Sequence, residues 1–371
     1  MPRGVIFFAP SPAYVQGLSE RATGIALKRH PREKFFLATK LSNFSPSTHS
    51  REESLAMYHR SFRDLQVDYI DYLLLHGIGM GGMEALRSRY LDNGMLDFLL
   101  KEREVGRIRN LGFSYHGDIE VFDYLLSRHD ELKWDFVQIQ LNYVDWRHAK
   151  EVNTRNTDAE YLYAELVKRN IPAVIMEPLL GGRLAGKLPP RARAVLDSAR
   201  DPHLRTPAAW GLSWVWNHPQ VTMLLSGMTD TAQVDENSSL ADLALPNSMT
   251  ANQLDTIAHV LDEFEKSNRV PCTGCGYCMP CPKGINIPGC FAAYNASYAH
   301  SWFTGLSQYF TASAVRTSEP KLVSNCVKCG KCARHCPQHI DIPERLDDVR
   351  RRFQPGPVTA MLKVFGKTRS S

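Results

Sequence analysis

The sequence lacks cysteine over its first 271 residues, so that all nine cysteines fall between Cys272 and Cys336. It also lacks any apolar run of about 18 residues, the length at which a membrane-spanning helix is predicted. Its opening apolar run is far too short for a secretory signal. These absences indicate a chain that neither crosses a membrane nor is secreted. Together with the unpaired thiols, they predict a protein of the reducing cytoplasm.

The cysteines form two runs, each closed by a Cys-Pro pair. The first run holds Cys272, Cys275, Cys278 and Cys281, and the second holds Cys326, Cys329, Cys332 and Cys336. The second run has the spacing C-x2-C-x2-C-x3-C-P, which bacterial ferredoxins use for a [4Fe–4S] cluster. The first run has the same design with a last spacer one residue shorter. Because the Cys-Pro thiolate usually serves the other cluster, we predict two clusters. Their ligands are Cys272, Cys275, Cys278 and Cys336 for one, and Cys326, Cys329, Cys332 and Cys281 for the other.

Disulfides and structural zinc are the competing interpretations. Disulfides suit a small secreted domain, whereas these cysteines crowd one end of a long chain. Zinc commonly uses paired C-x2-C units, and triplets closed by Cys-Pro fit that pattern poorly. Cys290 is left over, and a buried apolar role explains it better than a ligand role. The long aromatic-rich stretch between the two runs favours helical connections, so we predict an α-helical ferredoxin-like domain.

In the cysteine-free part, short apolar runs alternate with amphipathic segments. The predicted strands are Val5–Phe8, Phe35–Thr39, Ile70–Leu75, Ile108–Phe113, Phe136–Leu141, Ala173–Glu177 and Val221–Leu225. The predicted helices are Ser19–His30, Arg51–Leu65, Met95–Val105, Ile119–Ser127, Asp158–Arg169 and Ala208–Asn217. This alternation is typical of a parallel sheet, and its spacing predicts an α/β fold of the (β/α)8 TIM-barrel type. No G-x-G-x-x-G follows the first strand, as a Rossmann sheet would require. Seven strands are predicted where eight are needed, so either one is unrecognised or the first β/α unit is missing.

These patterns divide the chain into three parts. We expect the barrel in residues 1–262, the iron–sulfur domain in 268–345 and a basic tail in 346–371. A helix at Thr250–Ser267 is expected to lead out of the barrel. The tail, which includes Lys363, Lys367 and Arg369, is better explained as a solvated segment than as a docking site.

Seven stretches near the strand ends share a family pattern. They are Pro-Ala-Tyr14-Val-Gln-Gly-Leu-Ser-Glu20, Phe-Leu-Ala-Thr-Lys40, Asp-Tyr-Leu-Leu-Leu-His76-Gly, Gly106-Arg-Ile-Arg-Asn-Leu-Gly-Phe-Ser114, Val-Gln138-Ile-Gln-Leu-Asn142, Met176-Glu-Pro178-Leu-Leu-Gly-Gly182, and Leu-Ser226-Gly227-Met228 running to Asn237. In this order they resemble the aldo-keto reductase family over about residues 4–240. With the two cysteine runs, the chain resembles the iron–sulfur-containing branch of that family.

The resemblance implies a barrel that binds NAD(H) or NADP(H) at the C-terminal ends of its strands. Such a barrel reduces a small-molecule aldehyde or ketone, or oxidises an alcohol. In it, Tyr14 would protonate the carbonyl oxygen, Lys40 would lower the pKa of the phenol, and His76 would orient the carbonyl. The nucleotide-binding residues that it implies are Ser114, Gln138, Met176, Pro178, Leu179, Gly182, Ser226, Gly227, Met228, Gln233 and Asn237. Because Gly227 and Gln233 stand where NADPH-binding relatives often have cations, NADH is expected to bind at least as tightly as NADPH.

The three candidate catalytic residues also have ordinary structural explanations. Tyr14 could simply pack, and His76 could be a satisfied core histidine, whereas a buried lysine such as Lys40 is rare without a partner. The chain departs from the family at Ala9, where an aspartate normally pairs with the lysine. Met1 also lies just before what resembles the family's second strand. These departures are expected of a truncated chain, a misassigned start or a relative that has lost activity.

Three functions therefore stay open from the sequence. The first is an NAD(P)-dependent oxidoreductase that carries two clusters, with a possible redox partner protein. The second is an iron–sulfur electron-transfer protein that uses the barrel as a scaffold, and the third is an inactive homologue. The formal net charge of +5 falls to about +1 if each four-thiolate cluster contributes roughly −2. The charge balance therefore gives no support for a nucleic-acid partner.

Overall fold

The computed structural model describes residues 5–152, 157–186, 188–267, 269–299, 301–314 and 320–356. The chain divides into two compact units, which are described separately. The first comprises Met1–Arg147, Thr157–Pro178 and Val215–Ser248, and the second His148–Asn156, Leu179–Trp214 and Met249–Ser371. The domain boundaries at 262 and 268 stay a prediction. Residues 357–371 of the predicted basic tail lie outside the described residues.

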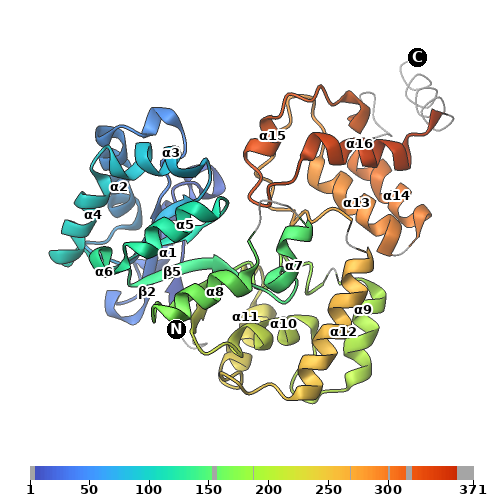
Figure 1. Ribbon diagram of the computed structural model, residues 1–371, viewed down its shortest axis with the longest axis horizontal. Coiled ribbons are helices and arrows are strands. Elements are labelled where there is room, and N and C mark those ends of the chain that lie inside the picture. The colour runs from blue at the N-terminus through green and yellow to red at the C-terminus, as the bar shows by residue number, and fades with distance from the viewer. Residues whose placement is uncertain are drawn as a thin grey trace. The chain divides into compact units, whose positions relative to one another are not determined.

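A seven-stranded parallel sheet organises the first unit (Figure 1). Its strands follow one another in chain order, and each pairs in parallel with the next. They are β1 (Phe7–Phe8), β2 (Phe36–Leu41), β3 (Ile70–Ile78), β4 (Ile108–Tyr115), β5 (Phe136–Gln140), β6 (Ala173–Met176) and β7 (Val221–Leu224). All seven predicted strands are confirmed, with small differences at their ends. The arrangement is that of an open, barrel-type sheet in which β1 and β7 form the two edges.

The strands read as nearly continuous apolar runs because both faces of a parallel sheet are covered. Leu73, Leu74 and Leu75 of β3 are all buried, although successive side chains point to opposite faces. Leu74 belongs to a buried cluster with Ala38 of β2, Phe136 of β5 and Val174 of β6. This packing fixes the register of the sheet and therefore the positions of the residues that follow each strand.

Helices alternate with the strands, as the sequence predicts. Those of the first unit are α1 (Ser19–Leu27), α2 (Arg51–Leu65), α3 (Gly82–Leu86), α4 (Met95–Glu104), α5 (Ile119–Ser127), α6 (His129–Leu132), α8 (Ala159–Lys168) and α11 (Thr231–Ala241). Helices α7 (Asp145–Val152) and α10 (Pro207–Trp216) contain residues of both units. Helix α2 shows how the sequence sets their ends: the Ser50 hydroxyl accepts a hydrogen bond from Glu53 N at 3.2 Å, and Gln66 terminates the helix in a left-handed conformation.

The second unit is helical. Its helices are α9 (Pro190–Ala199), α12 (Ala251–Ser267), α13 (Ile287–Ala299), α14 (Trp302–Ala312), α15 (Lys331–Arg334) and α16 (Ile342–Phe353). Helix α9 packs against α12, and α13 packs against both α14 and α16. The core includes Phe291, Tyr309 and Phe353, and the last two rings stack with their centroids 5.1 Å apart. The predicted helical ferredoxin-like fold is therefore confirmed, as is the helix predicted at Thr250–Ser267.

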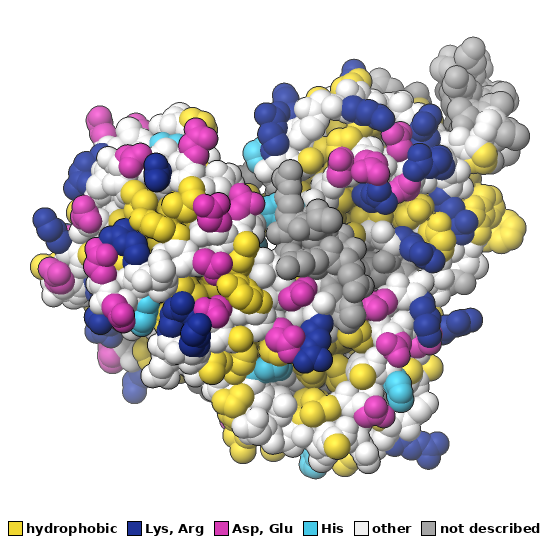
Figure 2. Space-filling model, in the orientation of Figure 1, with side chains coloured by type: hydrophobic (Ala, Val, Ile, Leu, Met, Phe, Trp, Pro, Cys, Tyr) yellow, Lys and Arg dark blue, Asp and Glu magenta, His cyan; other side chains and the backbone are white. Residues whose placement is uncertain are grey.

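The surface carries charges of both signs. On the face drawn in Figure 2, Lys and Arg side chains alternate with Asp and Glu side chains over both units, with apolar side chains between them. The described residues include no helix that is both long enough and apolar enough to cross a membrane.

Candidate active site and cluster cavities

Tyr14, Lys40 and His76 lie together beside the C-terminal ends of β2 and β3. Tyr14 is in the short turn Tyr14–Gly17 after β1, Lys40 is in β2 and His76 is in β3. The Lys40 Nζ lies 4.7 Å from the centre of the Tyr14 ring, and the rings of Tyr14 and His76 meet edge to face with centroids 5.8 Å apart. Three residues separated in sequence thus form one group at the end of the sheet where barrel chemistry takes place.

Lys40 is buried with 2 % of its surface exposed. Its Nζ donates hydrogen bonds to the backbone carbonyls of Ala9 and Pro10, at 3.3 Å and 3.2 Å. Burial lowers the pKa of Lys40 to about 7, while the charge of Glu20 acts in the opposite direction. Neutral carbonyls hold an ammonium ion less strongly than a carboxylate does. Buried and held at Ala9 and Pro10 by carbonyls, Lys40 therefore has a pKa near neutrality.

Glu20 is a buried acid whose role the sequence did not reveal. It lies in the first turn of α1 with 1 % of its surface exposed, and the Thr39 hydroxyl donates to its carboxylate at 2.5 Å. Burial raises the pKa of Glu20, and hydrogen bonds from Thr39 and Ser61 oppose that rise. An acid at a helix start is ordinarily explained by the helix dipole, so the sequence offers no signal that this one faces the core beside β2.

His76 is buried among polar groups that fix its ring. Its Nδ1 lies 2.6 Å from the Ser42 hydroxyl, which in turn lies 2.9 Å from the hydroxyl of Ser11. Burial, and then the charge of Lys40, lower the pKa of His76 well below its usual value. The imidazole is therefore neutral at physiological pH. With Nδ1 engaged by Ser42, Nε2 is the nitrogen that remains for a ligand.

Arg89 and Tyr90 hold the backbone around His76. The Tyr90 hydroxyl accepts a hydrogen bond from His76 N at 3.0 Å and donates to Leu41 O at 2.8 Å, so it joins β3 to β2. Arg89 donates to the carbonyls of His76 and Gly77. Both residues come from a π-helical turn at Arg87–Leu91, an irregularity often found at functional sites. Nothing in the sequence pattern predicts these contacts, because they join distant segments.

The predicted nicotinamide-binding residues end three adjacent strands. Ser114 of β4, Gln138 of β5 and Met176 of β6 are all buried. The Ser114 hydroxyl accepts from Gly77 N at 3.0 Å, and the Gln138 amide lies 3.2 Å from the Met176 sulfur. These three residues therefore lie at the C-terminal ends of the strands, as the catalytic candidates do.

The predicted diphosphate and adenosine residues fall into separate segments. After β7, the Asn237 amide donates to the Ser226 hydroxyl at 3.0 Å, which ties α11 to the segment that contains Gly227 and Met228. The Gln233 side chain accepts from Thr229 N at 2.9 Å. Pro178 is the last residue of the segment Thr157–Pro178 of the first unit. Leu179 and Gly182 belong to the second unit. There, Gly181 and Gly182 take φ values of +61° and +79°, which glycine adopts without strain.

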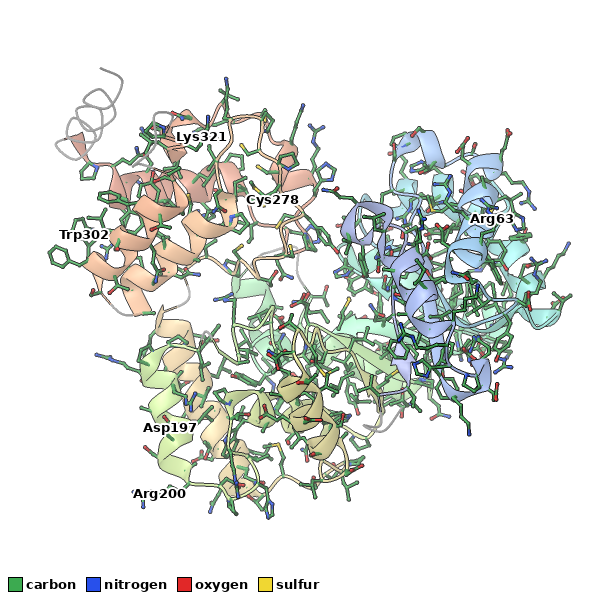
Figure 3. All side chains as sticks on the ribbon, turned by 180° about the vertical axis from the view of Figure 1, so that it is seen from behind. Arg63, Asp197, Arg200, Cys278, Trp302 and Lys321 are labelled. Carbon is green, nitrogen blue, oxygen red and sulfur yellow. The ribbon has the colours of Figure 1, made fainter. Side chains whose placement is uncertain are left out.

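The eight predicted cluster cysteines line two cavities of the second unit. One cavity is lined by Cys272, Cys275, Cys278 and Cys336, and the other by Cys281, Cys326, Cys329 and Cys332. Each Cys-Pro cysteine thus lies with the three cysteines of the other run, as predicted. Figure 3 labels Cys278. Cys290 lines neither cavity and is fully buried on α13, consistent with the apolar role predicted for it.

The chemistry of these cavities fits iron–sulfur clusters. Burial, followed by the neighbouring Cys272, Cys275 and Cys336, raises the pKa of the Cys278 thiol to about 12. Four thiols that face one another disfavour ionisation unless a cationic core lies among them, as the iron of a cubane would. In the described part of the chain, no three His, Cys, Asp or Glu side chains are arranged to hold a single metal ion.

Comparison with known proteins matches two family models to successive parts of the chain. The model of the aldo/keto reductase family matches residues 2–258, and that of the 4Fe-4S dicluster domain matches residues 271–340. An L-galactose dehydrogenase from Arabidopsis thaliana is 26% identical over 247 residues, which cover 63% of this chain and 73% of that protein.

Solved structures share the barrel fold. An aldo-keto reductase from Bacillus halodurans in its holo form has a TM-score of 0.52 at 22% identity, covering 70% of this chain and 83% of that one. An aldo-keto reductase from Klebsiella pneumoniae in complex with NADPH has a TM-score of 0.52 at 21% identity, covering 70% and 81%. The family match spans more than half of the sequence, so the chain belongs to the aldo/keto reductase family and carries a C-terminal 4Fe-4S dicluster domain.

Proposed function

We propose that the protein reduces the carbonyl group of a small molecule with NADH or NADPH, or oxidises the corresponding alcohol, and that it also holds two [4Fe–4S] clusters. The observation that carries the proposal is the grouping of Tyr14, buried Lys40 and neutral His76 at the C-terminal ends of β2 and β3. A phenol, an ammonium ion and an imidazole in contact provide an acid, a group that adjusts its strength and a hydrogen-bond donor.

Each residue has a distinct part in carbonyl reduction. Tyr14 gives its phenolic proton to the carbonyl oxygen as negative charge develops there. Lys40 in its charged form stabilises the phenolate that remains, which makes the phenol a stronger acid. His76 is neutral, so it donates a hydrogen bond from Nε2 to the carbonyl oxygen and does not act as the proton source. The bound nicotinamide supplies the hydride.

Nicotinamide binding is supported by the residues at the C-terminal ends of β4, β5 and β6. Ser114, Gln138 and Met176 would hold the nicotinamide end, with the amide and hydroxyl groups facing its carboxamide and the thioether packing on its ring. Of the residues of the first unit, Pro178, Ser226, Gly227, Met228, Gln233 and Asn237 would hold the remainder of the nucleotide. The Klebsiella pneumoniae relative was solved with NADPH, which supports binding of a nicotinamide nucleotide by a barrel of this fold.

The cluster ligands would be the two sets of four cysteines that line the cavities. A cubane exchanges one electron, whereas nicotinamide transfers two as hydride. The clusters therefore serve a redox partner protein or stabilise the fold. None of the nine cysteines is in a disulfide, in keeping with a reducing cytoplasm.

The test is a steady-state assay of the anaerobically purified full-length protein. Oxidation of NADH and NADPH is followed against a panel of aldehydes and ketones, and nucleotide binding is titrated separately. Turnover supports the proposed reaction, whereas nucleotide binding without turnover on any substrate in either direction would mean a binding protein.

An iron–sulfur electron-transfer protein is the second candidate. It is favoured by the two four-cysteine cavities, whereas Ala9 weakens the case for catalysis because Lys40 is held by carbonyls rather than by a carboxylate. This candidate requires a reversible cluster couple in a protein that does not bind nicotinamide nucleotides, so the two titrations separate the candidates.

Replacing Ala9 with aspartate should extend activity to higher pH. The pKa of Lys40 is about 7, so its ammonium form is present below that pH and is lost as the pH rises through it. If reduction needs the ammonium ion, kcat in the parent falls above about pH 7. The Ala9 carbonyl already lies 3.3 Å from Nζ, so a carboxylate on this residue raises the pKa of Lys40. The pH dependence of kcat for the parent, Ala9→Asp and the uncharged control Ala9→Asn tests this; an identical falling limb in all three would contradict it.

Replacing Gln233 with arginine should favour NADPH. Gln233 is neutral and accepts from Thr229 N, and Asp230 at the start of α11 adds a carboxylate nearby. A guanidinium there would pair with the 2′-phosphate, and a gain of about tenfold in NADPH affinity corresponds to one charge-assisted interaction. NADH affinity should change little. Fluorescence titrations of the parent, Gln233→Arg and Gln233→Glu measure the effect, and tighter NADPH than NADH binding by the parent would contradict the expected preference.

A further inference from the structure

Thr273 has a buried hydroxyl without a hydrogen-bond partner in the described part of the chain. It lies between the first two cysteines of the first run and lines the cavity of Cys272, Cys275, Cys278 and Cys336. Its exposed fraction is 6 %, and its Oγ1 has no hydrogen-bond partner among the described residues. Leaving a buried hydroxyl unpaired costs free energy, so such groups in native proteins usually have a partner. The partner that remains for this hydroxyl is a group bound in the cavity.

The Thr273 backbone is held in place. A Cβ added at Gly181 would lie 2.3 Å from the Thr273 carbonyl oxygen and 3.0 Å from its Cβ. The backbone of Gly181 therefore packs directly on Thr273, within the second unit. Just before Thr273, the Asn295 side chain accepts from Val270 N and donates to Val270 O, at 2.8 Å and 2.6 Å. These contacts keep Thr273, a residue that lines the cavity, buried rather than in solvent.

The second cavity lacks an equivalent group. Val327 occupies the matching position after the first cysteine of its run, and its exposed fraction is 58 %. Of the described residues that line this cavity, none carries a hydroxyl. In the first cavity the other polar side chain is Gln338, which has an interaction of its own. The two cavities thus offer equal sets of thiols but different surroundings.

We propose that the Thr273 hydroxyl donates a hydrogen bond to a sulfur atom of the cluster held by Cys272, Cys275, Cys278 and Cys336, and thereby gives this cluster a higher reduction potential. The inference rests on the proposed cluster assignment. Reduction adds one electron to the cluster and makes its sulfur atoms more negative. A donor therefore stabilises the reduced form more than the oxidised form, and hydrogen bonds to sulfur are among the main determinants of cluster potential.

The hydroxyl raises the potential of its own cluster above the value that this cluster would have without it. It does not by itself order the two couples, because Lys328 N donates to the Cys326 sulfur at 3.4 Å and Lys283 lines the second cavity. Thr273 is a positioning residue in this proposal, since it acts through the cluster and contacts no substrate.

The test is a redox titration of anaerobically purified full-length protein, monitored by electron paramagnetic resonance. The variants are Thr273→Val, which removes the hydroxyl at nearly constant volume, Thr273→Ser, which retains it, and Thr311→Val, the same change on the exposed face of α14. Thr273→Val should shift one couple to lower potential and leave the other in place. Thr273→Ser and Thr311→Val should keep both parent couples.

Iron and sulfide analysis separates the two possible failures. Parent protein without two clusters overturns the cluster assignment and this inference with it. Two clusters whose couples are the same in the parent and Thr273→Val overturn the inference alone. If Thr273→Val loses iron, Thr273→Ala tests the same loss of the hydroxyl with a smaller side chain. A Thr273→Ser couple that shifts as far as that of Thr273→Val would also contradict a role for the hydroxyl.

Discussion

Replacing Cys336 with serine should remove the cluster of the first cysteine run, although Cys336 belongs to the second run. Cys336 lines one cavity with Cys272, Cys275 and Cys278. A cubane that loses a thiolate ligand in a buried cavity is exposed to hydrolysis and loss, since the remaining groups cannot complete its ligation. Iron content should fall from about eight to about four atoms per chain, an estimate from two four-iron clusters. Iron and sulfide analysis of anaerobically purified protein measures this.

Matched variants show which cluster has been lost. The paramagnetic signal of reduced Cys336→Ser should match that of Cys275→Ser and differ from that of Cys329→Ser, because Cys275 lines the same cavity and Cys329 the other. Cys290→Ser is the control, since this cysteine lies in the core away from both cavities, and both clusters should remain. A signal from Cys336→Ser that matches Cys329→Ser would mean that each run ligates its own cluster. Stoichiometric zinc in the parent would contradict clusters altogether.

The strands could be predicted because burial on both faces leaves a strong pattern. A run such as the one at Leu73–Leu75 has few alternatives in an α/β chain. The strand ends were less predictable, since β3 continues through His76 and Gly77 to Ile78, where polar and glycine residues break the apolar run. The helices α9 and α11 lie outside the predicted elements. Helix α11 carries weak periodicity, so tertiary packing decides that it is helical, whereas α9 is as amphipathic as the predicted α2 and was not recognised.

The cluster cavities could be predicted more fully than the barrel site. Cysteine spacing is a local pattern with few explanations, so even the pairing of Cys336 with the first run followed from the Cys-Pro rule. The barrel site depends on contacts between distant segments. Ser42 approaches His76, and Arg89 reaches the carbonyl of His76 from a π-helical turn. Serines and arginines at such positions look like ordinary surface or loop residues until the fold brings them together.

Replacing Tyr14 with phenylalanine should lower the rate of carbonyl reduction by about 10²–10⁴-fold, the usual effect of losing a positioned acid. The change removes one hydroxyl and almost no volume. The contacts of the ring with Lys40 and His76 are aromatic and should survive. His76 cannot replace the lost acid, because burial lowers its pKa and keeps it neutral. Nucleotide affinity should stay near that of the parent, and steady-state kinetics with parallel nucleotide titrations separate the two effects.

The size of the loss depends on Ala9. With Lys40 held by two carbonyls and its pKa near 7, the parent stabilises the Tyr14 phenolate best at low pH. The effect of Tyr14→Phe should therefore be largest below pH 7 and shrink above it. In an Ala9→Asp background the ammonium ion persists to higher pH, and the effect should then stay large over a wider range. Tyr14→Phe in both backgrounds, assayed across pH, provides the measurement. Parent-like activity of Tyr14→Phe at low pH would show that the proton comes from another group.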